Sequence, residues 1–438
     1  MEPQDADPAA PQYVSLNSSP SDRRLRVMRR GRLILIIAVL LALAGGFVGG
    51  KRYTERQIAA SQDRIITAVT NEEVGKPSAV DFSLFWSVWN KLHERYVDAE
   101  RLAAEALVYG AIEGMVNAVG DPYTVFFQPE PAQKFQESVG GSFSGIGIEI
   151  GKRDNGITVI SPIRDSPAWI AGIKAGDVVI AVDDEDSTQW TVDEAVDRIR
   201  GKQGTTVHLT IYREGESAPL EFDIVRDTIR IPAVAWKMLD DKVAYVQLMT
   251  FNGNITDQFT KAANELRQQG ATSLIIDVRD NPGGLLDAAV EIAGWLLPDD
   301  SLVVEERFSD GTNEELRANG NEALVDLPTV IIINGGSASA SEILAGALHD
   351  IRGLRLVGTT TYGKGSVQQL EDFYNGSALK VTIAKWFTPN GTSINDTGIA
   401  PTDELEIPEE EPEGGWLFGE PGKDPQLDRA LEIVNQLR

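Results

Sequence analysis

The chain of 438 residues contains no cysteine and only three histidines. Without cysteine it can form neither a disulfide bond nor a thiolate zinc site, and it has no thiol nucleophile. The three histidines, His93, His208 and His349, are scattered along the sequence, which argues against a histidine-based metal centre. The sequence therefore predicts no metal site.

The chain is also short of positive charge, with 40 lysines and arginines against 66 acidic residues and a formal net charge of −26. Nucleic-acid binding depends on clustered Lys and Arg, and the part of the chain after residue 51 shows no such cluster. A nucleic-acid partner is therefore not expected. The apolar share of 42% and the length instead predict a globular protein of two or three domains.

One long apolar run, LILIIAVLLALAGGFVGG at residues 33–50, carries no charge and follows the basic segment RRLRVMRRGR. It is just long enough to cross a bilayer, and the basic flank is expected to stay in the cytoplasm. We therefore expect a single-pass anchor in the inner (cytoplasmic) membrane, with the rest of the chain in the periplasm or at the cell surface. A buried core helix is one alternative. Cleavage at ALAG, near Ala44, is another and would give a secreted protein.

The rest of the N-terminal region is divided by composition. Residues 1–32 are predicted to be a disordered cytoplasmic tail and residues 51–79 a polar linker. Residues 80–140 form a helical segment whose pattern stops near Gly120-Asp121-Pro122. This segment carries an aromatic stripe made of Phe82, Phe85, Trp86 and Trp89. Such a stripe is typical of a core or of a dimer face, so one expectation is a homodimer through these helices.

Residues 141–230 change to short β-branched runs that are separated by turns and interrupted by two helical pieces. With SPAWIAGIKAGDVVIAVDD at residues 166–184, this arrangement resembles a PDZ domain of the bacterial, protease-associated kind. In that family, the turn Gly145-Ile146-Gly147 would offer backbone N–H groups to the terminal carboxylate of a peptide, and the strand from Ile148 would pair with the peptide. The alternative is that these glycines only form a turn into a strand.

Residues 231–403 have an α/β pattern. The segments TSLIIDV, LPTVIIIN and LRLVG indicate buried strands, while LLDAAVEIAGWLL and SEILAGALHD indicate helices between them. Parallel strands joined by helices are the expected arrangement, and VQQL and LKVTIAKWF are predicted to be further strands. Residues 404–423 form an acidic linker, and Asp424-Pro425 begins a last amphipathic helix in residues 424–438.

Three serines alternate in the segment IIINGGSASASEILAGALHD, and they are Ser337, Ser339 and Ser341. A serine hydroxyl needs a base that removes its proton. His349 lies on the same predicted helix, ~15 Å along its axis from the middle serine, so lysine is the remaining base. Ser339 could instead cap the helix, because Ser339 and Glu342 have the spacing of a capping box.

The best candidate for the base is Lys364 in TYGKGSVQQ, where two glycines permit close backbone approach. Its amine must be uncharged, and burial can lower its pKa from about 10.4 to about 7. In a strand, Lys364, Ser366 and Gln368 would share a face. Gln368 could then accept a hydrogen bond from the amine and fix its direction.

The same motifs give the chain a resemblance to the carboxy-terminal processing, or tail-specific, serine proteases with a PDZ domain. The matching segments are NGGSASASEILAGAL, TYGKGSVQQ, DVRDNPGGLL and FTPNGTSINDTGIAPT, and the resemblance runs from about residue 82 to the C-terminus. It implies an α+β multidomain fold: an N-terminal helical segment, a PDZ-like β-rich domain and a crotonase-like α/β protease core with a Ser-Lys dyad.

By the motifs of this family, the nucleophile is Ser339 and the general base is Lys364, with Gln368 as its orienter. Catalysis of this kind requires no metal or cofactor.

The oxyanion hole needs two N–H donors. The N–H that follows the nucleophile, on Ala340, would be one of them. The resemblance places the other on Gly283 or Gly284, and the sequence does not separate these two glycines. Their alternative role is that of a plain turn.

The resemblance implies a membrane-anchored, extracytoplasmic serine endopeptidase whose substrates are proteins with apolar C-terminal tails. The PDZ domain would deliver the tail and gate the site, and cleavage would pass through an ester on Ser339. Arg200 resembles an arginine that couples the PDZ domain to the protease core, although an exposed cation at a helix end is an adequate alternative. An adaptor that binds C-termini but is catalytically dead is the alternative from another functional class.

Overall fold

A computed structural model of the chain describes residues 81–98, 102–153, 156–320, 322–408 and 415–438. The predicted tail, apolar run and linker therefore lie outside the described residues. Within the described ranges, every helix is too short or too polar to span a bilayer.

The first described helix, α2 (Ser83–Arg95), belongs to a compact unit that ends at Leu102 and is separate from the unit of Ala103–Arg438. It confirms the first predicted helical pattern. None of its residues is buried, and its aromatic rings contact one another, with the centroids of Phe85 and Trp86 5.0 Å apart. Its apolar stripe is therefore largely exposed.

The second unit begins with α3 (Ala104–Asn117), β1 (Val125–Phe127) and α4 (Pro129–Gly140). Tyr109 and Val116 of α3 pack against Phe126 of β1 in a small core.

The β-rich region that follows has a core of its own and contains a sheet with the strand order β3-β4-β5-β7-β8. Its elements are β2 (Ser142–Gly145), β3 (Ile148–Arg153), β4 (Gly156–Pro162), α5 (Pro167–Ala171), β5 (Val178–Val182), β6 (Glu185–Asp186), α6 (Val192–Ile199), β7 (Thr206–Tyr212), β8 (Leu220–Val225) and β9 (Asp227–Arg230). β2 pairs with β9 beside this sheet. Among the described residues β3 is an edge strand, and α6 contacts it.

The C-terminal region contains a six-stranded sheet with the order β10-β11-β12-β15-β16-β19. These strands are β10 (Val234–Met238), β11 (Val243–Leu248), β12 (Ser273–Asp277), β15 (Thr329–Ile333), β16 (Arg355–Gly358) and β19 (Asp403–Glu404), and a short 3₁₀ turn (Asp240–Lys242) precedes β11. β11, β12, β15, β16 and β19 are parallel, and β10 is antiparallel to β11. The prediction of three parallel strands in this region is confirmed.

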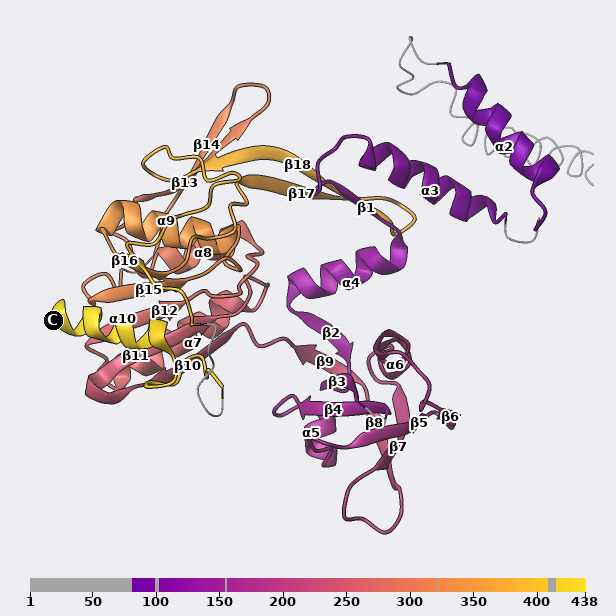
Figure 1. The fold of residues 1–438 in the computed structure, drawn as a ribbon, viewed down its shortest axis with the longest axis horizontal. Helices are drawn as coiled ribbons and strands as arrows, with labels where there is room; N and C mark the ends of the chain where they lie inside the picture. The colour runs from indigo at the N-terminus through magenta and orange to yellow at the C-terminus, as the bar shows by residue number, and fades with distance from the viewer. Residues whose placement is uncertain (1–80, 99–101, 154–155, 321, 409–414) are drawn as a thin grey trace, which may run out of the picture. The chain divides into compact units, whose positions relative to one another are not determined.

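Helices cover both faces of this sheet (Figure 1). One face bears α7 (Ile255–Gln268), α8 (Leu286–Ala293) and α9 (Ala340–Arg352), and the other bears α10 (Pro425–Gln436). Along β12, Ile276 faces the first helical layer and Ile275 faces α10. Burial on both faces explains the continuous apolar runs that predicted these strands.

The predicted C-terminal helix is confirmed and is tied to the sheet by a buried ion pair. Asp424 caps α10 by accepting from the Leu427 amide, 3.1 Å away. The Arg279 guanidinium contacts Asp277 at 2.5 Å and Asp424 at 2.7 Å. The loop after β12 is therefore anchored to the helix that covers the opposite face of the sheet.

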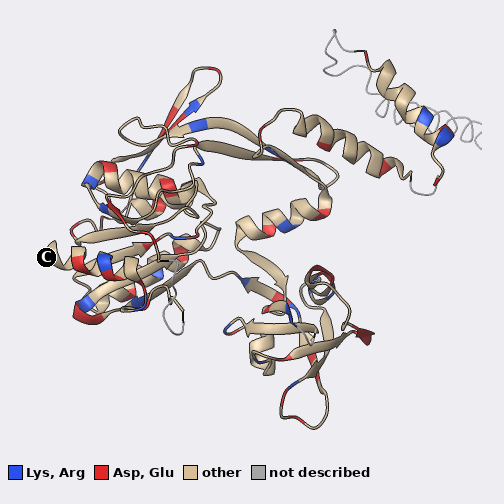
Figure 2. Ribbon diagram, viewed as in Figure 1, with Lys and Arg blue, Asp and Glu red and all other residues tan. Residues whose placement is uncertain are grey.

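A second sheet is built from β13 (Leu302–Phe308), β14 (Asn313–Arg317), β17 (Ser366–Asp372) and β18 (Ala378–Phe387), with β1 at one edge. β18 is its centre and pairs with β1, β13 and β17. The segments VQQL and LKVTIAKWF are therefore strands, as predicted. Figure 2 shows that lysines and arginines are spread singly over the elements and are mixed with acidic residues.

Candidate functional site

Ser339 stands at the junction between the turn after β15 and the first residue of α9. Its backbone has φ 55° and ψ −116°, a conformation that L-residues seldom adopt, and its side chain is partly exposed. The other two serines are fully buried: Ser337 Oγ donates to the Val278 carbonyl at 2.7 Å, and Ser341 Oγ donates to the Asn281 carbonyl at 2.9 Å. Of the three serines, Ser339 is thus the one that faces outward.

The predicted oxyanion segment lies directly against Ser339. A Cβ atom on Gly283, which has φ 91°, would lie 2.8 Å from Ser339 Cβ and 2.9 Å from the Ala340 nitrogen. Only glycine permits this approach. The Gly283 amide donates to Asn281 Oδ1 at 2.9 Å, so this N–H is already used in the present conformation.

Asn281 holds the oxyanion segment in place. Its side chain is fully buried, and Nδ2 donates to the Leu248 carbonyl at 2.8 Å. Its own carbonyl accepts from the Ala338 amide at 3.0 Å, next to the candidate nucleophile. On the other side, the Phe251 amide donates to the Gly283 carbonyl at 2.9 Å. In the sequence, Asn281 is distinguished only as the first residue of the NPGG segment.

Lys364 lies in the loop before β17, with its backbone carbonyl bound to the indole N–H of Trp386 at 2.9 Å. A Cβ on the neighbouring Gly365 would lie 2.7 Å from the Asn395 nitrogen, which confirms the need for close backbone approach. The Lys364 amine lies 5.1 Å from the centroid of the Tyr123 ring. Within the described residues this amine has no hydrogen bond or ion pair.

Four features of its surroundings act on the pKa of the Lys364 amine. Burial lowers the pKa of its amine, and the charge of Lys380 lowers it further. The carboxylates of Glu342 and Asp121 act in the opposite direction. The net direction is downward, as a lysine that acts as a base requires.

Glu342 joins the two candidate catalytic residues. Its carboxylate is fully buried and accepts from the Ser339 amide at 2.7 Å and from the Lys364 amide at 3.0 Å. It also accepts from the Gly363 amide at 2.7 Å and the Thr361 hydroxyl at 2.6 Å. Burial raises the pKa of Glu342, and these four donors oppose the rise. Glu342 therefore does more than complete the capping box: it also binds the loop that carries Lys364, which the sequence did not indicate.

Replacing Glu342 with glutamine should loosen both loops, because the amide NH₂ would face N–H donors that the carboxylate now accepts. Each buried donor left without an acceptor costs about 1–3 kcal/mol of unfolding free energy. Misplacement of a reacting group by ~1 Å costs ~10²-fold in rate, so kcat should fall by one to two orders of magnitude. Denaturant unfolding and peptidase assays measure both effects. The exposed Glu291→Gln on α8 is the control, and a Glu342→Gln protein with the same kcat and stability as the natural chain would refute this role.

Gln368 lies on β17, but a bulge between Val367 and Gln368 interrupts the pairing with β18. Lys364 precedes the strand, so the strand periodicity predicted for Lys364, Ser366 and Gln368 begins only at Ser366. Gln368 Nε2 donates to Ser366 Oγ at 2.9 Å and to Thr382 Oγ1 at 3.3 Å. In this conformation these bonds orient the Gln368 amide.

The candidate peptide-binding residues lie where β2 meets β3. Gly145 ends β2, Ile146 is buried in the core of the β-rich region, Gly147 has φ 78°, and Ile148 begins the edge strand β3. The turn is fixed by its carbonyls: Ile146 accepts from the Ala168 amide at 2.9 Å, and Gly147 accepts from the Ile163 amide at 2.9 Å.

Arg200 follows α6 and contacts α4 and β2. Its Nη1 lies 3.4 Å from Glu137 Oε2, and its guanidinium lies 4.1 Å from the centroid of the Phe143 ring. It therefore links the β-rich region to the helix that precedes it.

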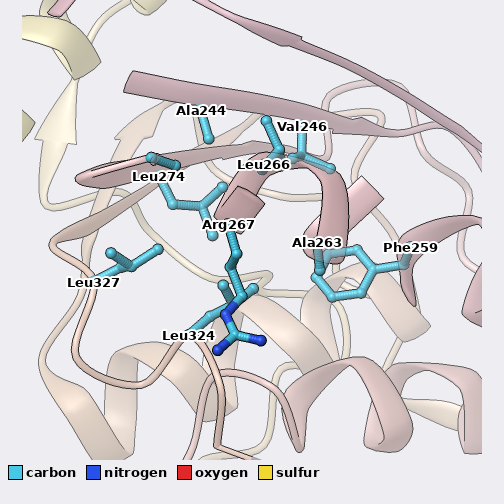
Figure 3. A pocket seen from close by; sticks show the side chains of 10 residues that line it. Ala244, Val246, Phe259, Ala263, Leu266, Arg267, Leu274, Leu324 and Leu327 are labelled. Atoms are coloured by element: carbon cyan, nitrogen blue, oxygen red, sulfur yellow. The ribbon is translucent and has the colours of Figure 1, made fainter. Parts of the chain in front are cut away.

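A small apolar cavity lies elsewhere, beneath α7, and is lined mainly by aliphatic side chains with Arg267 beside them (Figure 3). None of the candidate site residues lines it.

The catalytic candidates lie on loops at the carboxyl ends of the strands β12 and β15 and before β17.

Comparisons with known proteins agree with these motifs. Residues 242–405 match the family described as "Peptidase family S41", and residues 133–212 match the "PDZ domain" family. Residues 39–131 match the family described as "Activating protease CtpB N-terminal domain". The carboxy-terminal processing protease CtpA of Bacillus subtilis (strain 168) is 35% identical over 354 residues, which cover 80% of this chain and 76% of that protein.

Two further relatives are similar to the chain. The carboxyl-terminal-processing protease of Synechocystis sp. is 38% identical over 73% of this chain and 76% of its own length. The solved photosystem II D1 C-terminal processing protease is 32% identical and has a TM-score of 0.43, with 75% of this chain and 89% of that one covered. Sequence identity at this coverage decides the family. The chain belongs to the carboxy-terminal processing proteases of peptidase family S41, serine-type peptidases that here carry a PDZ domain.

Proposed function

We propose that this chain is a membrane-anchored, extracytoplasmic endopeptidase that cleaves proteins with apolar C-terminal tails by means of a Ser339-Lys364 dyad. The observation that carries the proposal is the common anchor Glu342, which binds the backbone of both residues and thereby joins an outward-facing serine to an amine of lowered pKa. Their loops come from different sheets, so this connection is specific.

In the proposed acylation step, the neutral Lys364 amine accepts the hydroxyl proton as Ser339 Oγ attacks the scissile carbonyl carbon. Lys364 then gives the proton to the leaving amine, so the C-terminal fragment departs and an ester remains on Ser339. A water molecule then loses a proton to Lys364 and attacks the ester, and Lys364 returns that proton to Ser339 Oγ as the acyl–oxygen bond breaks and the acid product leaves. Each proton transfer is carried by this one lysine.

The tetrahedral oxyanion is stabilised in this proposal by two backbone N–H groups. The Ala340 amide is the first N–H group of α9, where the helix dipole also favours negative charge. Of the two glycines, Gly284 is the better second donor in this conformation, because the Gly283 amide is bound to Asn281. Gln368 would orient Lys364 by accepting a hydrogen bond from the amine at Oε1, while its Nε2 donates to Ser366 Oγ.

The PDZ domain is proposed to bind the substrate tail as an added strand. β3 is an edge strand with α6 beside it, an arrangement suited to an extended peptide between them. The turn Gly145-Ile146-Gly147 would receive the terminal carboxylate. Arg200, through its contact with Glu137 of α4, would then transmit occupancy toward the protease core.

Membrane attachment and self-association are proposed from the N-terminal region. The uncharged residues 33–50 with their basic flank support a single-pass anchor that leaves the protease outside the cytoplasm, or a secreted enzyme if cleavage occurs near Ala44. The exposed aromatic stripe of α2 supports a homodimer, because an apolar helix face without a buried residue can pack against a second copy.

A substrate comparison tests the proposed function against a catalytically dead adaptor. The full chain is incubated with a protein that ends in apolar residues and with a copy that ends in aspartates, and products are identified by mass spectrometry. We expect cleavage of the apolar-tailed protein and at least about tenfold slower cleavage of the other, since burial of the aspartate carboxylates on binding would be disfavoured. Tail binding without any product would establish the adaptor instead.

A further inference from the structure

A second lysine, Lys380, lies on the same face of the sheet as the residues around Lys364. On β18, Lys380 and Thr382 are two residues apart, so their side chains share a face. Thr382 pairs with Gln368 of β17, and Lys380 pairs with Val125 of β1. Lys380 is therefore two residues away from Thr382, whose hydroxyl accepts a hydrogen bond from the candidate orienter Gln368.

The loop that contacts the Lys364 amine runs along this part of β18. Tyr123, whose ring lies under that amine, comes two residues before Val125, the strand partner of Lys380. The Thr382 amide donates to Thr124 Oγ1 at 3.1 Å, and the Thr382 hydroxyl donates to Asp121 Oδ2 at 2.6 Å. Lys380 and Lys364 thus approach the same short loop.

The Lys380 amine has an unusual environment for a lysine. It lies 5.7 Å from the ring centroid of Phe127 and 5.4 Å from that of Phe135, within the range of a cation–π contact. In the part of the chain that the structure describes, it has no hydrogen bond and no ion-pair partner. Burial lowers the pKa of the Lys380 amine, while the two rings and the charge of Asp121 favour its cationic form.

The groups that face Lys364 come from each element around it. Glu342 of α9, Asp121 and Tyr123 before β1, Tyr362 before β17 and Lys380 of β18 are the titratable ones. Burial and Tyr362 raise the pKa of Tyr123 to about 12, so it is neutral at physiological pH. Burial disfavours ionisation of Asp121, but hydrogen bonds from Thr124 and Thr382 outweigh it and hold its pKa below the usual range. Lys380 is the one cation in this set.

We propose that Lys380 is a positioning residue whose positive charge keeps the Lys364 amine in its neutral form, the form that can accept the serine proton. This inference rests on the proposed dyad. Two carboxylates near Lys364 would otherwise favour its ammonium form, and a fixed cation on the same face offsets them. The lowered pKa of Lys364, to which burial contributes most and Lys380 next, has the direction that this arrangement requires. A pair of neighbouring lysines activates an amine in the same way in other enzymes.

The test is the pH dependence of kcat/KM for Lys380→Met in the full chain. We expect its acidic limb to move to higher pH by about half to one unit, which corresponds to a three- to tenfold loss at neutral pH and recovery at alkaline pH. Lys380→Arg should leave the limb in place because it keeps the charge. Lys385→Met, an exposed lysine on the same strand, is the matched control. A loss that is equal at all pH values would indicate a packing role and overturn the proposal.

A second measurement does not depend on peptidase activity. In a Ser339→Ala background, the Lys364 amine is titrated by pulse labelling with an amine-selective reagent at a series of pH values, and the label is located by mass spectrometry. Adding Lys380→Met should raise the midpoint by about half to one pH unit, as in the kinetic test. An unchanged midpoint overturns the proposal even if the enzyme is active. If the midpoint shifts but the chain with Ser339 intact shows no peptidase activity, the electrostatic coupling is supported and only the proposed dyad is refuted.

Discussion

Lys364→Met should lower kcat/KM at neutral pH by about 10⁴-fold or more. The variant removes the group that accepts and returns every proton in the proposed cycle, and loss of a base that acts with its nucleophile as a unit costs nearly as much as loss of the whole set. Methionine keeps much of the side-chain volume and is apolar, so the loops bound to Glu342 should hold their geometry. The residual rate would report the oxyanion donors and substrate binding alone.

The same variant should be more stable than the natural chain. Burial lowers the pKa of Lys364 in the folded state, while the unfolded value is about 10.4, so the unfolded chain binds more protons between these two pH values. The folded natural protein therefore gains stability as the pH rises through that window. Below the pKa of Lys364 in the folded state, the free-energy cost of burying the charged amine is present in full. Lys364→Met lacks this slope, and its advantage, at about 1.4 kcal/mol per unit of lowering, should shrink toward pH 10.

The absence of cysteine from the natural chain permits a chemical control for this variant. Lys364→Cys introduces the sole thiol, which bromoethylamine converts to an aminoethyl side chain of nearly the length of lysine. Cleavage should be absent before alkylation and return afterwards. Denaturant unfolding at several pH values measures the stability. Full activity in Lys364→Met, or no recovery after alkylation of a folded Lys364→Cys protein, would contradict the proposed base.

Local sequence patterns were sufficient to predict the strands that are buried on both faces. TSLIIDV and LPTVIIIN became β12 and β15 because helices cover each side of the sheet, so nearly every residue in them is apolar. The cap at Asp424 also depends on neighbours in sequence, since its carboxylate binds an amide three residues on. The motif containing Ser339 was informative for a similar reason: small residues and a helix start lie within a few positions.

The parts of the candidate site that the sequence did not predict depend on contacts between segments far apart in the chain. Asp121 and Thr382 are bonded although 261 positions separate them, and Lys380 contacts the rings of Phe127 and Phe135, which are also far from it in the sequence. Hydrophobic periodicity does not report such pairs. The strand alternation predicted for Lys364, Ser366 and Gln368 was limited by a local feature: Lys364 precedes β17, and the pairing with β18 shifts register between Val367 and Gln368.

Ser339→Ala and Ser339→Gly should both lose about 10⁴- to 10⁶-fold in kcat, yet they should differ in stability. Ser339 has φ 55° and ψ −116°, where a Cβ atom is strained by about 1–3 kcal/mol and glycine is not. The flexibility of glycine in the unfolded chain costs about 0.5–1 kcal/mol. The glycine variant should therefore exceed the alanine variant by about 1 kcal/mol in unfolding free energy. Binding of an apolar-tailed peptide should be retained in both.

Ser341→Gly is the matched control, because Ser341 lies in α9 and its hydroxyl binds the Asn281 carbonyl. This change should destabilise the fold, through both the helix propensity of glycine and the lost hydrogen bond. Suppose that Ser339→Gly is more stable than Ser339→Ala and that Ser341→Gly is less stable than the natural chain. The fold would then hold Ser339 in a strained conformation that exposes its hydroxyl. If Ser339→Gly were instead no more stable than Ser339→Ala, the strain would be absent, and the outward orientation of Ser339 would need another cause.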